Sequence, residues 1–125
     1  MPITRIDLRK GKSLEFKATL TAEIHEAMRE TFDVPENSFV VITEHDEDTF
    51  TFSRIYRGVE HSDDLVIIQI TANNTRTIEK KKALYAQLAE RLGRRPGVRP
   101  QDVVVNILEV AKENWSLGNG LAQYA

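Results

Sequence analysis

The sequence predicts an α+β fold in which tandem β-α-β units form a four-stranded mixed sheet, with two helices on one face and an extra short strand or hairpin. Two observations support this prediction. First, the order strand, helix, proline-containing turn and apolar strand occurs twice along the chain. Second, Val34 and Phe39 of the first copy recur as Val98 and Val103, 64 residues later in each case.

Length and composition indicate one domain, residues 1–125, with an internal duplication at about 1–62 and 63–125. Such a chain can bury about two-thirds of its unfolded surface. The net charge of -2 provides no general attraction to nucleic acid or to an anionic membrane. The absence of cysteine excludes disulfides, thiolate nucleophiles and sulfur-rich metal sites. No apolar signal region or membrane-spanning run is present, so a cytoplasmic protein is the default expectation.

The first unit begins with a short strand, Ile3 to Leu8. Ser13 is suited to cap a helix whose apolar residues recur at helical spacing up to about Phe32. The helix is then broken over 33–37, because proline and the residue before it both disfavour continuation. An apolar, β-branched strand follows from Phe39 to Thr43.

The connection between the units contains a further strand pattern. Thr49 to Ser53 alternates phenylalanine with polar residues. This predicts a half-exposed strand that pairs back across 44–48. A charged loop is expected over 54–64.

The second unit starts at Leu65 to Ile70, the most apolar strand, which is expected at the centre of the sheet. A helix is predicted from about Thr77 to Leu92, ended by Gly93. Val103 to Leu108 is the last long strand, and the tail over 114–120 is a loop with at most a short hairpin. The predicted inner face of the second helix consists of Ile78, Leu84, Tyr85, Leu88 and Leu92.

Right-handed crossovers place both helices on the same face of the sheet. The other face must also be covered, because a large exposed apolar face is unfavourable. We therefore expect oligomerisation through the sheet, with the C-terminal tail as a candidate exchange element.

Pro2 is the first candidate functional residue. A small residue after Met1 normally permits removal of the methionine, which leaves the Pro2 nitrogen as a free secondary amine. The reference pKa of an α-amino group is about 7.7–8.0, and burial lowers it, so this amine is suited to act as a base near neutral pH. With Met1 retained, the nitrogen is a tertiary amide without that capacity, and the proline is structural.

Arg76 is the second candidate. It lies between the central strand and the second helix, beside Asn74 and Thr75, where backbone N–H groups and the helix dipole favour an anion. An arginine binds a carboxylate bidentately, with about 1.5–3 kcal/mol for each charged hydrogen bond. The alternative is a surface arginine at a helix start, where the dipole disfavours it.

Pro2 and Arg76 share a site only if the first strands of the two units run antiparallel, as a two-fold relation between duplicated units would give. An amine base and an arginine facing one cleft suit a small keto acid. The arginine would bind the carboxylate, and the proline nitrogen would move a proton on the adjacent carbon. The positive field would stabilise the enolate.

Other polar and aromatic residues offer weaker signals. Trp115 and Leu117 are candidates for an apolar wall of the site, although Trp115 also suits a core or interface anchor. His45, flanked by Glu44 and Asp46, is a candidate proton relay. The three histidines are too scattered along the chain to indicate a metal site.

Three features occur together: Pro2 before a strand, Arg76 within Asn74-Thr75-Arg76-Thr77-Ile78-Glu79, and the tail segment Asn114-Trp115-Ser116-Leu117-Gly118. With 34–37 and 102–105, they cover nearly the whole chain. This combination resembles the tautomerase superfamily, specifically its malonate semialdehyde decarboxylase-like branch.

The resemblance implies a homotrimer with a pseudo-sixfold core, a small-molecule carboxylate substrate and no cofactor. It further implies that Pro2 is the catalytic proline, that Arg76 binds the substrate carboxylate, and that Trp115 and Leu117 form a hydrophobic wall. Two further candidate substrate-binding positions depart from the family. Ser38 stands where the decarboxylases are expected to carry aspartate, and Asn74 stands where some carry a second arginine.

These departures favour proton transfer over decarboxylation. Ser38 can donate or accept a hydrogen bond but supplies no negative charge, so Pro2 is easier to deprotonate. We therefore expect a keto-enol tautomerase acting on a small 2-keto or enol carboxylic acid. The alternatives are a malonate semialdehyde decarboxylase-like lyase or hydratase, and a non-catalytic ferredoxin-like module that binds a small molecule.

Overall fold

The computed structural model describes residues 2–35 and 38–125. Met1, and Glu36 and Asn37 of the first connection, lie outside the described residues. The described elements, in chain order, are β1 (Ile3–Arg9), α1 (Leu14–Phe32), β2 (Phe39–His45), β3 (Ile55–Tyr56), β4 (Val59–Glu60), β5 (Val66–Asn73), α2 (Ile78–Arg94) and β6 (Val103–Val110). Short 3₁₀ helices occupy Glu47–Thr49, Pro100–Asp102 and Lys112–Asn114.

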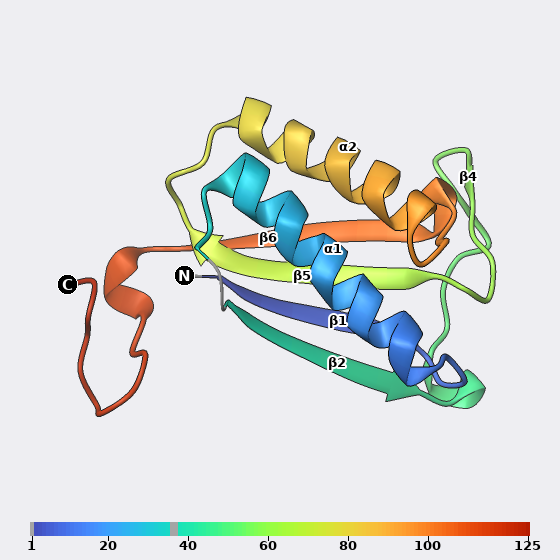
Figure 1. The fold of residues 1–125 in the computed structure, drawn as a ribbon, viewed down its shortest axis with the longest axis horizontal. Coiled ribbons are helices and arrows are strands. Elements are labelled where there is room, and N and C mark those ends of the chain that lie inside the picture. Colours follow the sequence, from blue (N-terminus) through green and yellow to red (C-terminus); the bar gives the residue numbers. More distant parts are fainter. Residues whose placement is uncertain (1, 36–37) are drawn as a thin grey trace.

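The long strands form the predicted four-stranded mixed sheet, in the order β2-β1-β5-β6. β1 is parallel to β2 and β5 is parallel to β6, whereas the central pair β1 and β5 is antiparallel. Figure 1 shows α1 and α2 packed side by side across one face of this sheet. The similarity of the two β-α-β units extends to single positions, because Val34 after α1 and Val98 after α2 are both buried.

One hydrophobic core fills the space between the sheet and the helices. Alternate residues of β1, which are Thr4, Ile6 and Leu8, point into it. From α1, Ile24 and Met28 meet them, and both are fully buried. Each apolar side chain of this size contributes about 1.5–3 kcal/mol when it is removed from water. The core therefore fixes the first strand, and with it the position of the N-terminus.

Both helix starts are capped by side chains. The Ser13 hydroxyl accepts a hydrogen bond from the Phe16 amide at 3.0 Å, which confirms the predicted cap. The Thr77 hydroxyl accepts one from the Lys80 amide at 3.3 Å. The second cap fixes the residue after Arg76, so it contributes to placing that arginine.

The predicted strand from Thr49 to Ser53 is wrong. The extra two-stranded element is instead the β3-β4 hairpin, which lies within the region expected to be a charged loop. Phe50 is buried and stacks on His45 with ring centroids 5.3 Å apart, and Phe52 meets the edge of Phe50 at 5.8 Å. The alternating phenylalanines thus belong to an aromatic cluster and not to a paired β-strand.

The predicted end of the second helix is also wrong. α2 continues through Gly93 to Arg94 and ends before the Arg95-Pro96 bond, because proline disfavours the helical conformation of the residue before it. Of its predicted inner face, Ile78 and Tyr85 are exposed (61% and 39%). The buried stripe is narrower and has a spacing of four residues: Leu84, Leu88 and Leu92.

The other face of the sheet carries no helix in the described chain (Figure 1). The strand register aligns Phe39, Ile3, Thr71 and Leu108 in one row across all four strands. Phe39 and Leu108 at its two ends are 49% and 45% exposed, and Val41 of the neighbouring row is 41% exposed. We call this surface the open sheet face.

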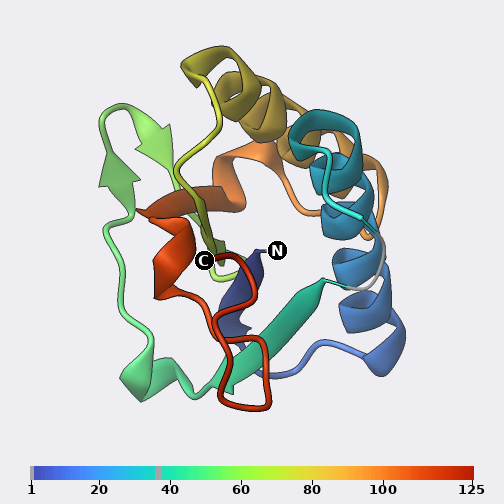
Figure 2. The ribbon, with the colours of Figure 1, turned by 90° about the vertical axis from the view of Figure 1, so that its left-hand side faces the viewer.

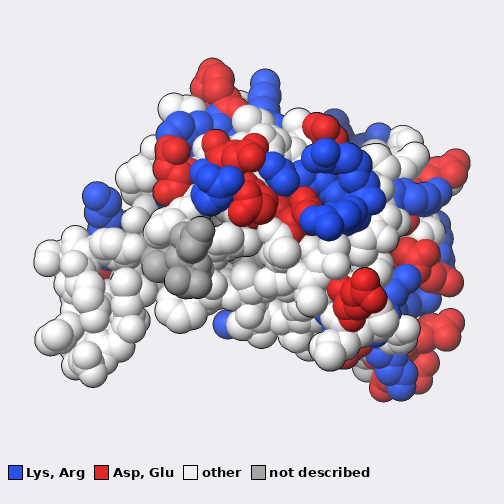
Figure 3. Space-filling view, viewed as in Figure 1, with Lys and Arg blue, Asp and Glu red and all other residues white. Residues whose placement is uncertain are grey.

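The C-terminal tail, residues 115–125, extends beyond the end of the sheet (Figure 1). It contains no charged side chain, and it is white in Figure 3, where acidic and basic side chains alternate over the helices. Neither helix of the described chain is long and apolar enough to cross a membrane.

Candidate active site

Four chain segments meet at one end of the sheet, which faces the viewer in Figure 2. The antiparallel pairing of Ile3 with Thr71 places the start of β1 beside the end of β5. The parallel pairing of Ile3 with Phe39 places the start of β2 on the other side. Pro2, which precedes β1 and is buried, therefore lies between the segment that contains Ser38 and the end of β5. This is the antiparallel arrangement on which a shared site depends.

Arg76 lies in the connection from β5 to α2 at the same end of the sheet. Its Nη2 atom donates a hydrogen bond to the carbonyl oxygen of Phe32 at 2.9 Å. Its guanidinium carbon lies 5.0 Å from the centroid of the Phe32 ring. Arg76 thus satisfies a carbonyl at the C-terminus of α1, and within residues 2–35 and 38–125 most of its five N–H donors have no other hydrogen-bond partner.

Trp115 ties the tail to the same end of the sheet. Its indole Nε1 donates to the Asn73 Oδ1 atom at 2.6 Å, and both residues are buried. This bond anchors the start of the tail to the end of β5. Leu117 is half-buried, two residues further along the tail, and its amide donates to Gln123 Oε1 at 2.8 Å.

Asn74 is exposed directly after β5. Its backbone amide donates to the Val110 carbonyl at 3.0 Å, which continues the pairing of β5 with β6. The backbone bond fixes where the residue stands at the end of the strand.

Ser38 is half-buried, and its hydroxyl oxygen lies 3.1 Å from Nδ1 of His25 on α1. Both residues line a groove of about 440 Å³ between α1 and β2. The pairing of Ser38 with His25 was not visible from the sequence, because the spacing between a helix and the following strand does not reveal which helical residue faces the connection. The remaining lining residues are Ala18, Thr21, Ala22, Glu26 and Val40.

The proton relay expected around His45 is not formed by its sequence neighbours. His45 Nε2 lies 2.6 Å from Asp7 on the adjacent strand. Asp46 pairs with Lys10, whose hydrogen bond and charge hold the pKa of Asp46 below its ordinary value. Glu44 pairs with Lys17. This cluster lies at the C-terminal end of β2, remote from Pro2.

Within 2–35 and 38–125, no group of three or more acidic or histidine residues is arranged to hold a metal ion.

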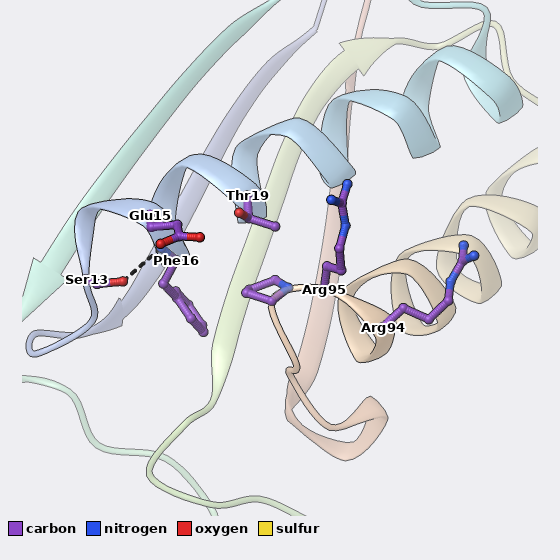
Figure 4. Close-up of a pocket in the computed structure, with 7 residues that line it drawn as sticks. Ser13, Glu15, Phe16, Thr19, Arg94 and Arg95 are labelled. Carbon is purple, nitrogen blue, oxygen red and sulfur yellow. Dashed lines mark hydrogen bonds between the residues drawn. The ribbon is translucent and has the colours of Figure 1, made fainter.

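Another cavity, of about 350 Å³, lies where α1 begins and α2 ends (Figure 4). Arg95 extends from it toward α1 and pairs with Glu23 at 2.5 Å, and Arg91 pairs with the same carboxylate at 3.2 Å. These hydrogen bonds, led by that from Arg95, hold the pKa of Glu23 below its ordinary value despite its burial. Arg91 and Arg95 thus join the two helices through Glu23, and the cavity lies at the end of the molecule opposite Pro2.

Comparisons with known proteins identify the family of this chain. Two family models described as tautomerase enzymes match the chain, one over residues 37–118 and the other over residues 2–52. The probable tautomerase YusQ of Bacillus subtilis (strain 168) is 40% identical over 124 residues, which are 98% of each chain. The chain therefore belongs to the tautomerase superfamily and is an enzyme of that superfamily.

Solved structures specify the branch. A malonate semialdehyde decarboxylase structure, described as a basis for decarboxylase and hydratase activities, matches with a TM-score of 0.91 and 26% identity, covering 98% of this chain and 95% of that one. FG41 malonate semialdehyde decarboxylase inhibited by 3-bromopropiolate matches with a TM-score of 0.90 and 33% identity, covering 98% and 93%. An asymmetric trimer of fused 4-OT shares the fold, with a TM-score of 0.79, 22% identity and coverage of 97% and 96%. The malonate semialdehyde decarboxylase-like branch follows from the first two.

Proposed function

We propose that this enzyme is a keto-enol tautomerase that acts on a small 2-keto or enol carboxylic acid. The observation that carries the proposal is the position of Pro2, buried at the start of β1 and adjacent to the end of β5 that leads to Arg76. A basic amine and a guanidinium at one end of the sheet suit such a substrate: the amine suits the carbon and oxygen that exchange a proton, and the guanidinium suits the carboxylate. A tautomerase-type activity is also what the family and its probable tautomerase relative support.

In the proposed reaction, the Pro2 nitrogen takes one proton and returns one. For ketonisation, the enol hydroxyl loses its proton as the carbonyl C=O bond forms, and the neighbouring carbon gains a proton from the Pro2 ammonium. No net charge is gained and no oxidant or reductant is required. Arg76 binds the carboxylate and stabilises the enolate that forms between the two proton transfers.

The other candidate residues shape the pocket around these groups. Trp115 and Leu117 belong to a tail that is anchored at this end of the sheet, and we assign them to the apolar wall that excludes water from the reacting carbon. Asn74 and Ser38 supply neutral hydrogen-bonding groups. Because neither carries a charge, the cationic form of Pro2 has no carboxylate partner at position 38.

Assembly as a homotrimer through the open sheet face completes the proposal. The row formed by Phe39, Ile3, Thr71 and Leu108 is the one nearest Pro2, so a neighbouring copy packed on it would border the site. Its exposed apolar side chains and the uncharged tail are the surfaces that such packing would bury.

Pro2→Ala tests the catalytic role of the amine. The mature mass of the wild type is first measured to establish that Met1 is absent. We expect the variant to keep its circular dichroism spectrum and to lose at least about 100-fold in kcat/KM for ketonisation of phenylpyruvate enol, because alanine lacks the ring that fixes the nitrogen. Undiminished turnover by the variant would refute the proposal.

A second candidate function, decarboxylation or hydration of a β-keto acid such as malonate semialdehyde, is favoured by the similarity to malonate semialdehyde decarboxylases. The neutral Ser38 argues against it, because that residue supplies no charge to hold the proline protonated. Coupled detection of acetaldehyde separates the two functions. Acetaldehyde formation that is faster than ketonisation would make the lyase the principal activity.

A further inference from the structure

We propose that His25 is a positioning residue that acts through Ser38. In this assignment, the His25 imidazole donates a hydrogen bond to the Ser38 oxygen and thereby directs the Ser38 hydroxyl proton toward a substrate held beside Pro2. This inference rests on the proposed function, and it adds to it a residue from α1.

The contact itself is well defined. His25 is half-buried on α1, and its Nδ1 atom lies 3.1 Å from Ser38 Oγ. Its other ring nitrogen, Nε2, is buried and has no hydrogen-bond partner among the described residues. Within the part of the chain that the structure describes, the contact with Ser38 is therefore the one hydrogen bond of this imidazole.

Because Nε2 has no hydrogen-bond partner among the described residues, one tautomer of His25 is favoured. A neutral imidazole carries its proton on one nitrogen and a lone pair on the other. A buried N–H without a partner is less favourable than a buried acceptor without one. The proton therefore belongs on Nδ1, where it is donated to Ser38 Oγ. With an oxygen lone pair engaged by His25, the Ser38 hydroxyl is free to donate its own proton elsewhere.

The strand register shows where that hydroxyl lies. Ile3 of β1 pairs with Phe39 of β2 as the first pair of the ladder, so the residues just before them, Pro2 and Ser38, come next to each other at its start. Two residues further on, Thr4 is buried in the core and Val40 packs against it. By strand alternation, Pro2 and Ser38 belong to the same side of the sheet, which is the side of α1 and His25.

This arrangement gives Ser38 a role different from that of an aspartate. A carboxylate at this position only accepts hydrogen bonds and favours the protonated amine. A serine that is itself hydrogen-bonded by His25 donates to the oxygen of the substrate, which becomes negative in the enolate. The bond stabilises that oxygen and transfers no proton, so Pro2 remains the group that takes and returns the proton.

The test uses three substitutions of His25. His25→Phe removes the N–H, and we expect kcat for ketonisation to fall about 3- to 10-fold with little change in KM, which is the effect of one neutral hydrogen bond. His25→Asn should recover most of this loss, because the asparagine Nδ2 stands where the histidine Nδ1 stood. His25→Gln should not, because its amide nitrogen corresponds to Nε2. His61→Phe, in the charged connection near the hairpin, is the control and should leave kcat unchanged.

Two further measurements separate positioning from mere structural support. In a Ser38→Ala background, His25→Phe should have no additional effect on kcat, since there is no hydroxyl left to orient. Additive losses, or wild-type kcat in His25→Phe alone, would overturn the inference.

The imidazole nitrogens are also observable without turnover. In ¹⁵N NMR spectra of the wild type at a pH where His25 is neutral, the proton should reside on Nδ1. A protonated Nε2 would overturn the inference even in an active enzyme. Failure of the proposed function has a different signature: no ketonisation by the wild type, with the Nδ1–H tautomer still present.

Discussion

At the scale of single residues, the candidate site carries neutral groups at positions 38 and 74. Ser38 is paired with His25, and the backbone amide of Asn74 is bonded to Val110. The positive charge of Arg76 is therefore not opposed by an acidic residue at either of these positions. Such a site suits a substrate that brings one carboxylate and needs a single basic nitrogen.

Arg76→Gln tests the carboxylate contact. The variant should lower kcat/KM about 10- to 100-fold, mainly through KM, because one or more charged hydrogen bonds are lost. Arg94→Gln is the matched control, since Arg94 is 65% exposed at the other end of α2 and should leave kcat/KM unchanged. Thermal unfolding of both variants is compared, because Arg76 also binds the Phe32 carbonyl. If the decrease in kcat/KM were explained by the loss of stability alone, Arg76 would not be a substrate-binding residue.

Asp102 makes the stability of the fold depend on pH. Burial disfavours its charge, but the hydroxyl and amide of Ser62 and the guanidinium of Arg99 donate to it and together hold its pKa below the ordinary value. The folded-state pKa is thus lower than the unfolded one, so this stabilisation is complete above about pH 4 and is lost as the pH falls through the folded-state value.

We expect Asp102→Asn to destabilise the protein by about 2–4 kcal/mol at pH 7 and to flatten the acid side of its stability curve. Urea unfolding at a series of pH values between 3 and 7 measures both effects. A variant with the same acid dependence as the wild type would show that other carboxylates control it.

Some candidate residues can be recognised from the sequence, and others only from the structure. Pro2 and Arg76 are recognisable because each stands at an unusual place, one at a potential amino terminus and one at a helix start. His25 carries no such sign: its role depends on which face of α1 meets the following connection. The pairing of His45 with Asp7 was missed for the same reason, since contacts between neighbouring strands depend on register.

At the scale of elements, helix starts were predicted better than helix ends. The Ser13 cap acts within a few residues, so it is visible in the sequence. The end of α2 was misplaced because Gly93 was given the role of a stop signal, whereas the constraint comes from Pro96. The aromatic alternation at Phe50 and Phe52 is misleading because Phe50 stacks on His45, the last residue of β2, instead of pairing in a strand.

Gly93→Ala tests whether position 93 belongs to the helix α2. Gly93 is helical and exposed, and a Cβ there would meet only the Val98 carbonyl, at an ordinary 3.7 Å. The substitution should stabilise the protein by about 0.4–1 kcal/mol, because alanine loses less backbone entropy. Gly97→Ala is the contrast: its φ of +104° makes the same change unfavourable. Destabilisation by Gly93→Ala in urea unfolding would contradict this account.

At the scale of the whole molecule, the two β-α-β units explain both the success of the fold prediction and the existence of the open sheet face. Two equivalent units place both helices on one side, as the 64-residue repeat indicated. The repeat cannot specify what covers the other side, because in the proposed assembly that depends on a second copy of the chain.

Leu108→Glu tests the proposed trimer. Leu108 is 45% exposed at the end of the apolar row on the open sheet face, and a buried charge there should shift the mass in solution from trimer toward monomer. Leu14→Glu, on the helix side and 82% exposed, should leave the mass unchanged. Sedimentation equilibrium distinguishes the outcomes, and a monomeric wild type would refute the proposed assembly.

The bond between Trp115 and Asn73 has a practical consequence. Trp115 is the single tryptophan of the chain, and it is seated at the end of the sheet where the candidate active site lies. The protein thus contains its own optical reporter, whose emission depends on the polarity around one known indole. Shifts of this emission on addition of unlabelled carboxylic acids would give their affinities directly, independently of whether any of them is turned over.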